Sequence, residues 1–96
     1  MDFGGGFINI DKSLKALNDE NRRKILFMLR DRDMSAGEIA EAFDLKNATV
    51  SYHLSLLKDA GLIISKKEKN YIYYKLNMSV FEEVISYILN FTKKGD

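Results

Sequence analysis

The sequence predicts a mainly helical domain that carries one small β-hairpin between its fourth and fifth helices. Five segments place apolar residues at helical spacing, and most of them begin at a residue that favours helix starts. Two runs within residues 62–76 are instead rich in β-branched and aromatic residues, and a lysine-rich connector separates them. The 96 residues, of which 46% are apolar and 30% charged, suit one globular domain.

The first two helices are expected to begin at acidic residues. Glycines at positions 4–6 indicate a flexible segment over residues 1–10. The first helix then runs from about Asp11, its N-cap, to Leu17. The second follows Asp19, another N-cap, and its buried stripe consists of Ile25, Leu26 and Leu29.

The third and fourth helices have the clearest boundaries. Ser35 and Glu38 form a capping box, in which the hydroxyl accepts from the N3 amide and the carboxylate accepts from the cap amide. A connection of three residues, 44–46, leads to the fourth helix, which is expected to start at Asn47 as its N-cap. Gly61 is expected to end that helix in the left-handed conformation.

The hairpin follows the fourth helix. Strands are expected at 62–65 and 71–76, joined by the polar connector 66–70. Because side chains alternate along a strand, one face of the second strand is expected to point to the core, and it carries Ile72, Tyr74 and Leu76.

A final helix is expected from Ser79 to Thr92. Its first residue would form a second capping box with Glu82. Four helices, a basic hairpin and a last helix are the chain order of a winged helix-turn-helix domain, here over residues 11–92 with a tail at 93–96.

The composition excludes several kinds of site. With no Cys and one His, we expect neither a metal site nor a bound cofactor within one chain. The sequence shows no nucleophile–base pair and no glycine-rich phosphate loop, so an enzyme is not expected. Because it also shows no signal-peptide pattern and no apolar run of membrane-spanning length, we expect a cytoplasmic protein without membrane insertion.

Positive charge is concentrated in one segment. Residues 46–75 hold six lysines against two acidic residues, a net +4 in a chain whose total is +1, so the remaining residues carry −3. Such a segment is typical of a surface that faces DNA, and a solvated lysine-rich hairpin is the alternative.

The fourth helix has an outward face that suits the major groove of DNA. Val50, Leu54 and Leu57 lie on one side and are expected to face the core. The other side carries small or hydrogen-bonding residues, expected at base edges: Ala48, Thr49, Ser51, Tyr52 and Ser55. Contacts to the DNA backbone are expected from the helix start and the connector, at Lys46, Asn47, Lys66, Lys67 and Lys69. An ordinary solvent-facing helix is the alternative.

The two ends of the domain carry more apolar surface than a chain of this size easily buries. A two-fold homodimer would bury it. The expected interface consists of Leu14, Leu17, Phe81, Val84, Ile85, Ile88 and Leu89. The alternative is that these residues complete the core of a monomer.

Two residues of the fourth helix fit neither face. His53 lies near the apolar stripe, and a partly buried histidine with a local hydrogen-bond partner is the first interpretation. A pH sensor or a metal ligand is the second. Leu56 points away from the stripe, and packing against another element would account for it.

Several segments carry a family resemblance. They are Asp19-Glu20-Asn21-Arg22-Arg23-Lys24-Ile25-Leu26, Gly37-Glu38-Ile39-Ala40, Thr49-Val50-Ser51-Tyr52-His53-Leu54-Ser55-Leu56-Leu57, Ala60-Gly61-Leu62-Ile63 and Tyr73-Tyr74-Lys75-Leu76. Together they resemble the ArsR family of winged-helix repressors over residues 11–90, although Glu20 stands where that family often has Pro. The segment 89–96 is similar to the Sdp-type autorepressor branch.

The resemblance implies a repressor that dimerises through its first and last helices and, in many members, senses a metal ion. The third helix here has no Cys pair and the last helix has no His or Asp ligand set, so both familiar metal sites are missing. We therefore expect a homodimeric, sequence-specific repressor that binds double-stranded DNA and does not respond to metals. Its signal could then come from a regulatory protein partner. A winged-helix module that binds proteins without specific DNA binding is the alternative.

Overall fold

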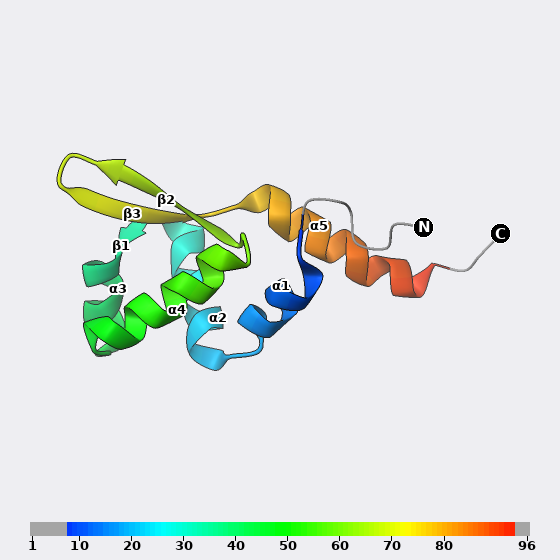
Figure 1. The fold of residues 1–96 in the computed structure, drawn as a ribbon, viewed down its shortest axis with the longest axis horizontal. Helices are drawn as coiled ribbons and strands as arrows, with labels where there is room; N and C mark the ends of the chain where they lie inside the picture. The colour runs from blue at the N-terminus through cyan, green and yellow to red at the C-terminus, as the bar shows by residue number, and fades with distance from the viewer. Residues whose placement is uncertain (1–7, 94–96) are drawn as a thin grey trace.

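The computed structural model describes residues 8–93, so most of the predicted segment 1–10 and tail 93–96 lies outside the described residues. The described part confirms the predicted order of four helices, a hairpin and a final helix (Figure 1). The elements are α1 Ile10–Leu17, α2 Glu20–Asp31, β1 Met34–Ser35, α3 Ala36–Phe43, α4 Asn47–Asp59, β2 Ile63–Glu68, β3 Tyr71–Leu76, α5 Met78–Leu89 and the short 3₁₀ helix η1 Asn90–Thr92.

Helices α1 to α4 form the body of the domain (Figure 1). The β2–β3 hairpin extends from one end of this body, and α5 leaves at the other end. The two parts that the sequence assigns to DNA and to dimerisation therefore project in different directions.

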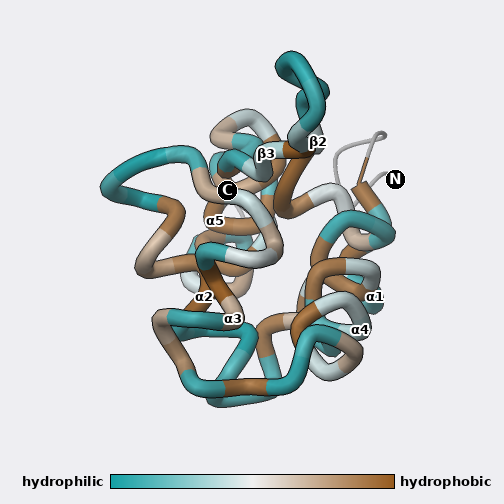
Figure 2. The backbone as a smooth tube through the Cα atoms, turned by 90° about the vertical axis from the view of Figure 1, so that its left-hand side faces the viewer, coloured by the Kyte–Doolittle hydropathy of each residue, from teal (hydrophilic) through white to brown (hydrophobic). Residues whose placement is uncertain are grey.

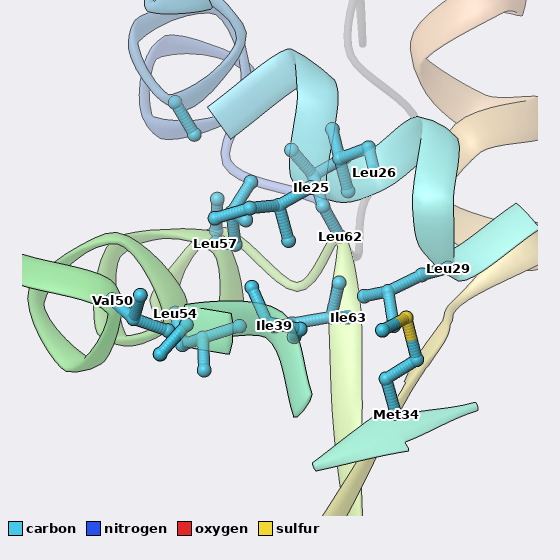
Figure 3. Packing of buried hydrophobic residues seen from close by; sticks show 13 residues of the cluster. Ile25, Leu26, Leu29, Met34, Ile39, Val50, Leu54, Leu57, Leu62 and Ile63 are labelled. Atoms are coloured by element: carbon cyan, nitrogen blue, oxygen red, sulfur yellow. The ribbon is translucent and has the colours of Figure 1, made fainter. Parts of the chain in front are cut away.

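One hydrophobic core joins α2, α3, α4 and the start of β2 (Figure 3). The stripes predicted on α2 and α4 both lie in it. Its members are Ala16, Ile25, Leu26, Leu29, Met34, Ile39, Ala40, Val50, Leu54, Leu57, Ala60, Leu62 and Ile63. Because burying one large aliphatic side chain is worth about 1.5–3 kcal/mol, the three inward residues of α4 fix how that helix is rolled about its axis.

Two of the predicted helix starts are confirmed. Asp19 caps α2 by accepting from the amide of Arg22 at 3.0 Å. The capping box of α3 is complete, because the amide of Glu38 donates to Ser35 Oγ at 3.2 Å and the amide of Ser35 donates to Glu38 Oε1 at 3.0 Å. Gly61 follows α4 with φ +78°, the left-handed conformation expected there.

The predicted starts of α1 and α4 are wrong by one or two residues. Asn9, not Asp11, caps α1 and accepts from a first-turn amide at 3.1 Å. Lys46, not Asn47, is the N-cap of α4, because its carbonyl accepts from the amide of Val50 at 3.1 Å. Asn47 is thus already inside the helix, where its side chain cannot cap.

The predicted capping box of the last helix does not form. Helix α5 begins at Met78, and Asn77 is its N-cap without a side-chain hydrogen bond. The amide of Asn77 donates to the carbonyl of Leu62 at 2.9 Å, and this bond ties the helix start to the residue that precedes β2. Ser79 therefore lies within the first turn, where it cannot serve as the cap for Glu82.

The sheet has three strands in the order β1–β3–β2, all antiparallel, where the sequence predicted two. The additional strand β1 is Met34–Ser35, and it pairs with β3 through Met34↔Tyr74 and Ser35↔Tyr73. A strand of two residues is too short to show alternation of apolar and polar residues, so no sequence pattern predicts it.

The hairpin is longer and its turn tighter than predicted. Strand β2 continues to Glu68, so Lys66 and Lys67 lie on the strand and the turn contains only Lys69 and Asn70. The prediction that Ile72 faces the core is wrong, because the core ends before the outer half of the hairpin and Ile72 is 50% exposed. Tyr74 and Leu76 do pack against the core. Figure 2 shows a hydrophilic end to the hairpin.

Candidate nucleic-acid interface

Helix α4 is held against α3 by a tight turn. Asp44 takes the left-handed conformation, φ +53°, and the amide of Leu45 donates back to the carbonyl of Ala40 at 3.1 Å. With Val50, Leu54 and Leu57 buried beneath, the opposite side of α4 must face outward (Figure 3). This is the arrangement that a helix needs to enter a DNA groove.

The residues predicted at base edges lie on that outward side. Ala48, Ser51, Tyr52 and Ser55 are exposed, and Thr49 is half-buried. Tyr52 is the largest of them, with 60% of its surface exposed. Their side chains offer hydroxyl groups, a methyl group and one aromatic ring to a facing surface.

The start of α4 brings two further predicted residues to the same end. Lys46 and Asn47 are both exposed. No side chain caps this helix, so its first amides remain available as hydrogen-bond donors. Free amides at a helix start, next to a lysine, favour an anion such as a phosphate.

The β2–β3 hairpin forms the wing, and its three lysines, Lys66, Lys67 and Lys69, do not share one surface. All are exposed, but the register pairs Lys67 with Ile72 and Lys66 with Tyr73, so these two lysines point to opposite faces of the hairpin. Lys67 lies on the face that continues the core side of the sheet. Lys69 lies in the turn with φ +58°, a left-handed conformation that is rare for residues other than glycine.

A groove lies between α4 and β3, and one of its lining residues is a lysine that was not among the predicted DNA contacts. Ser51, Ser55, Lys58 and Tyr74 line it together with the edge of Leu54, and its volume is about 240 Å³. Lys58 follows Ser55 by three residues and Ser51 by seven, so helical spacing alone would have placed it on the outward face. It connects the polar face of α4 to the wing.

The hydrogen-bond partner expected for His53 is present, but it comes from another helix rather than from nearby in the chain, and the ring is buried rather than partly buried. It is 7% exposed, and its Nδ1 lies 3.3 Å from Nη1 of Arg22, a buried arginine of α2. Leu56 lines a pocket between α4 and α1 with Lys12 and Ala16, which accounts for its direction away from the core stripe.

Two carboxylates near the start of helices are held in the charged form. Accepting from the backbone amide of Arg22 lowers the pKa of Asp19 below its usual 3.8. The backbone amide of Ser35 and then the guanidinium of Arg32, 3.0 Å away, lower the pKa of Glu38 below its usual 4.5. Both stabilise the start of their helix.

The described residues 8–93 contain no group of three or more His, Cys, Asp or Glu that could hold a metal ion. Over the same residues, no helix is both long enough and apolar enough to cross a membrane.

The predicted dimer residues fall into three groups by exposure. Leu14, Ile85, Ile88 and Leu89 are between 42% and 54% exposed. Leu17 and Phe81 are half-buried and pack against the core. Val84 is buried at 3% exposure, so little of its surface remains for a partner.

Comparison with known proteins agrees with this geometry. The family model described as bacterial regulatory protein, arsR family, matches residues 19–65, which span the helix-turn-helix and the start of the wing. The chain is similar to the transcriptional repressor SdpR of Bacillus subtilis (strain 168), with 45% identity over 82 residues that make up 85% of this chain and 91% of that protein.

Solved structures with the same fold are similar as well. An ArsR-like transcriptional regulator from Rhodococcus sp. RHA1 superposes with a TM-score of 0.78 at 27% identity, covering 84% of this chain and 76% of that one. A homodimeric winged helix-turn-helix DNA-binding domain from Mycobacterium bovis, a possible ArsR-family regulator, superposes with a TM-score of 0.72 at 25% identity. The match covers 84% of this chain and 77% of that one. The chain therefore belongs to the arsR family of bacterial transcriptional regulators, and it is a DNA-binding winged helix-turn-helix protein rather than an enzyme.

Proposed function

We propose that this protein is a sequence-specific transcriptional repressor that reads double-stranded DNA with α4 and acts as a homodimer in the cytoplasm. The observation that carries the proposal is the outward face of α4, where small polar side chains surround Tyr52 above a fully buried stripe. The similarity to a transcriptional repressor over most of both chains supports the repressor role.

The proposal assigns different kinds of DNA contact to the outward face of α4 and to the lysines. Thr49 and Tyr52 contact base edges, and each such contact discriminates between sequences by about 1–3 kcal/mol. Lys67, Lys69 and Lys58 meet phosphates, so each raises the affinity for any duplex, and losing one lowers the salt slope by about 1.

The test uses an operator selected from a random DNA pool. Thr49→Ala and Tyr52→Ala should weaken operator binding while leaving the affinity for random duplex nearly unchanged. Replacing Lys67 and Lys69 by Ala should weaken both and flatten the salt dependence. Lys66→Ala is compared with Lys67→Ala alone, because each removes one positive charge, from opposite faces of the hairpin, and Lys66→Ala should have the smaller effect.

Circular dichroism would confirm that every variant is folded. If the Thr49 and Tyr52 variants lose affinity for the operator and for random duplex equally, α4 is not the element that recognises the base sequence. If the protein lacks specific DNA binding and its salt dependence is weak, the alternative of a protein-binding winged helix is favoured instead.

The dimer would join α5 and α1 of two copies through the exposed set Leu14, Ile85, Ile88 and Leu89. The homodimeric relative from Mycobacterium bovis supports a homodimer, and the exposure of these apolar residues supports their place in its interface. Two copies of α4 would then meet half-sites about 34–36 Å apart, one turn of DNA.

We further propose that metal ions do not release the protein from DNA. The donor chemistry supports this, because the chain has no thiolate and a single imidazole, which is itself hydrogen-bonded to Arg22. Operator affinity should be unchanged when zinc is titrated in a chelator-controlled buffer. A saturable loss of affinity at one zinc per subunit would contradict the proposal, whereas unchanged affinity leaves a regulatory protein partner as the proposed source of the signal.

A further inference from the structure

Three helices meet at a buried polar cluster that the DNA-facing surface does not use. Arg22 of α2 and His53 of α4 are 8% and 7% exposed, unusual values for such polar side chains, and Arg22 lies against the end of α1. The α1–α2–α4 junction is visible in the lower middle of Figure 1. Buried cationic groups are costly unless they are paired, so this arginine needs its partners.

Arg22 finds those partners on two helices at once. Its Nε donates to the carbonyl of Ala16 at 2.8 Å and its Nη2 donates to the carbonyl of Lys15 at 3.2 Å, which satisfies the open carbonyl end of α1. Its Nη1 lies 3.3 Å from Nδ1 of His53. One guanidinium therefore connects the last turn of α1 to the middle of α4.

This contact assigns the proton of the imidazole. A guanidinium has donors and no acceptor, so Nδ1 of His53 must be the acceptor and must carry no proton. The same Nδ1 lies 4.0 Å from Oδ2 of Asp19. Asp19 accepts the amide of Arg22, which keeps its pKa low and its carboxylate charged. A protonated ring could no longer accept from Arg22, but it could donate to Asp19 after a small rotation.

We propose that His53 couples α4 to α1 in a proton-dependent way. The neutral ring holds α4 to α1 through Arg22, whereas the protonated ring turns to Asp19 and releases Arg22. The proposal rests on the proposed function, since α1 is placed in the dimer interface and α4 is the helix that recognises the DNA sequence. Releasing their link loosens the spacing of two recognition helices, so specific binding weakens while non-specific binding does not.

Several other charged or titratable groups lie near this junction. Besides Asp19 and Arg22, the ring contacts Tyr52 on its own helix, with centroids 5.6 Å apart. On the α1 side, Lys12 forms an ion pair with Asp59 at 3.1 Å, and Lys15 lines the same small pocket as Arg22. No hydrogen bond or ion pair found in residues 8–93 joins His53 to a charged side chain of α3 or β2. Histidine is the side chain whose charge ordinarily changes between about pH 5 and 8.

The first test follows operator affinity between about pH 8 and 5.5. In the wild type we expect a loss of about fivefold or more, the range of a typical coupling between two sites. His53→Asn should remove this loss, because an amide oxygen can accept from Arg22 and does not titrate. Asp19→Asn keeps a good helix cap but removes the charge that receives the protonated ring, so its loss of affinity should shift to more acidic pH. Random duplex serves as the control for general effects of pH.

The second test needs no DNA and therefore separates this proposal from the proposed function. The chain has one histidine, so the imidazole gives a single set of NMR signals. We expect Nδ1 without a proton in the neutral ring, and amide signals of residues 15–18 that shift together with the titration of the ring. A proton on Nδ1 of the neutral ring, or α1 signals that do not follow the titration, would overturn the proposal. So would equal pH dependence of operator binding in the wild type and in His53→Asn.

Discussion

At the scale of single residues, two glycines have opposite roles in this fold. Gly61 ends α4 with φ +78°, whereas Gly37 lies in the first turn of α3. A Cβ at position 61 would lie 3.5 Å from Cγ2 of Val80, an ordinary contact, so the penalty of Gly61→Ala comes from the backbone alone. We expect this change to lower the free energy of unfolding by about 1–2 kcal/mol.

Gly37→Ala is the matched variant and should act in the opposite direction. Its Cβ would approach nothing closer than Ser35 Oγ at 4.0 Å. Because alanine favours a helix over glycine, we expect a gain in the free energy of unfolding of up to about 1 kcal/mol. Urea unfolding of the two variants and the wild type measures both changes. Destabilisation by Gly37→Ala, or none by Gly61→Ala, would contradict this account of the two backbones.

Residue patterns predicted two of the three helix starts at which a side chain makes the capping hydrogen bond, and they missed the third, Asn9 of α1. Asp19 and Ser35 cap their helices through bonds within three residues of the chain, so a sequence window contains the whole interaction. The start of α5 depends instead on the bond from Asn77 to Leu62, fifteen residues away, and no local pattern reveals it. Ser79 is a residue type that favours the N-cap position, but it lies inside the first turn of α5.

At the scale of elements, the start of α3 should make the stability of the domain depend on acid. The pKa of Glu38 is lower in the folded chain than its usual 4.5, because it accepts from the amide of Ser35 and from Arg32. A carboxylate of this kind stabilises the fold above its unfolded pKa, and the stabilisation is lost as the pH falls through its folded pKa. The free energy of unfolding should therefore decrease below about pH 4.5.

Glu38→Gln isolates this contribution. The glutamine oxygen can still accept from the amide of Ser35, so the capping box is kept while the titrating group is removed. Urea midpoints measured between about pH 3 and 6 should fall less steeply in the variant than in the wild type. Asp19 contributes equally to both proteins, so it cancels in the difference. Parallel profiles would show that Glu38 plays no part in acid sensitivity.

The elements with a strong period were predictable, and the others were not. Helices α2 and α4 contain complete apolar stripes, and each stripe is buried as expected. Strand β1 has two residues and exists because Tyr73 and Tyr74, some forty residues later, provide a partner strand. Strand β2 extends to Glu68 because cross-strand pairing continues through polar residues, where composition alone suggested a loop, whereas β3 has the predicted bounds 71–76.

At the scale of the whole molecule, the candidate DNA surface was largely predictable because it lies on one helix. Helical spacing separates the buried and outward sides of α4 without knowledge of any other element. The wing needed the register as well, since only pairing places Lys66 and Lys67 on opposite faces. The apolar stripe of α5 contained too little information to separate Val84, which the chain itself buries, from the exposed residues around it.

The exposed part of that stripe leads to the last prediction, which concerns assembly. Ile85 is 54% exposed within the chain, so Ile85→Asp should leave the monomer folded. In a dimer the new carboxylate would be buried without a partner, a penalty of several kcal/mol that should dissociate the two copies. Sedimentation at micromolar concentration should give about twice the chain mass for the wild type and the mass of one chain for the variant.

Two neighbouring positions make this test specific to the interface. Ser86 is exposed and lies about 100° around α5 from Ile85, at the edge of the exposed apolar set, so Ser86→Asp adds the same charge and should weaken the dimer less. Val84 is 3% exposed, so Val84→Asp should unfold the chain rather than yield a folded monomer, as circular dichroism would show. A wild type that sediments as a monomer, or a dimer that survives Ile85→Asp, would mean that α5 does not join two copies. The two α4 helices would then have no fixed spacing across DNA, and specific binding would have to arise from one recognition helix alone.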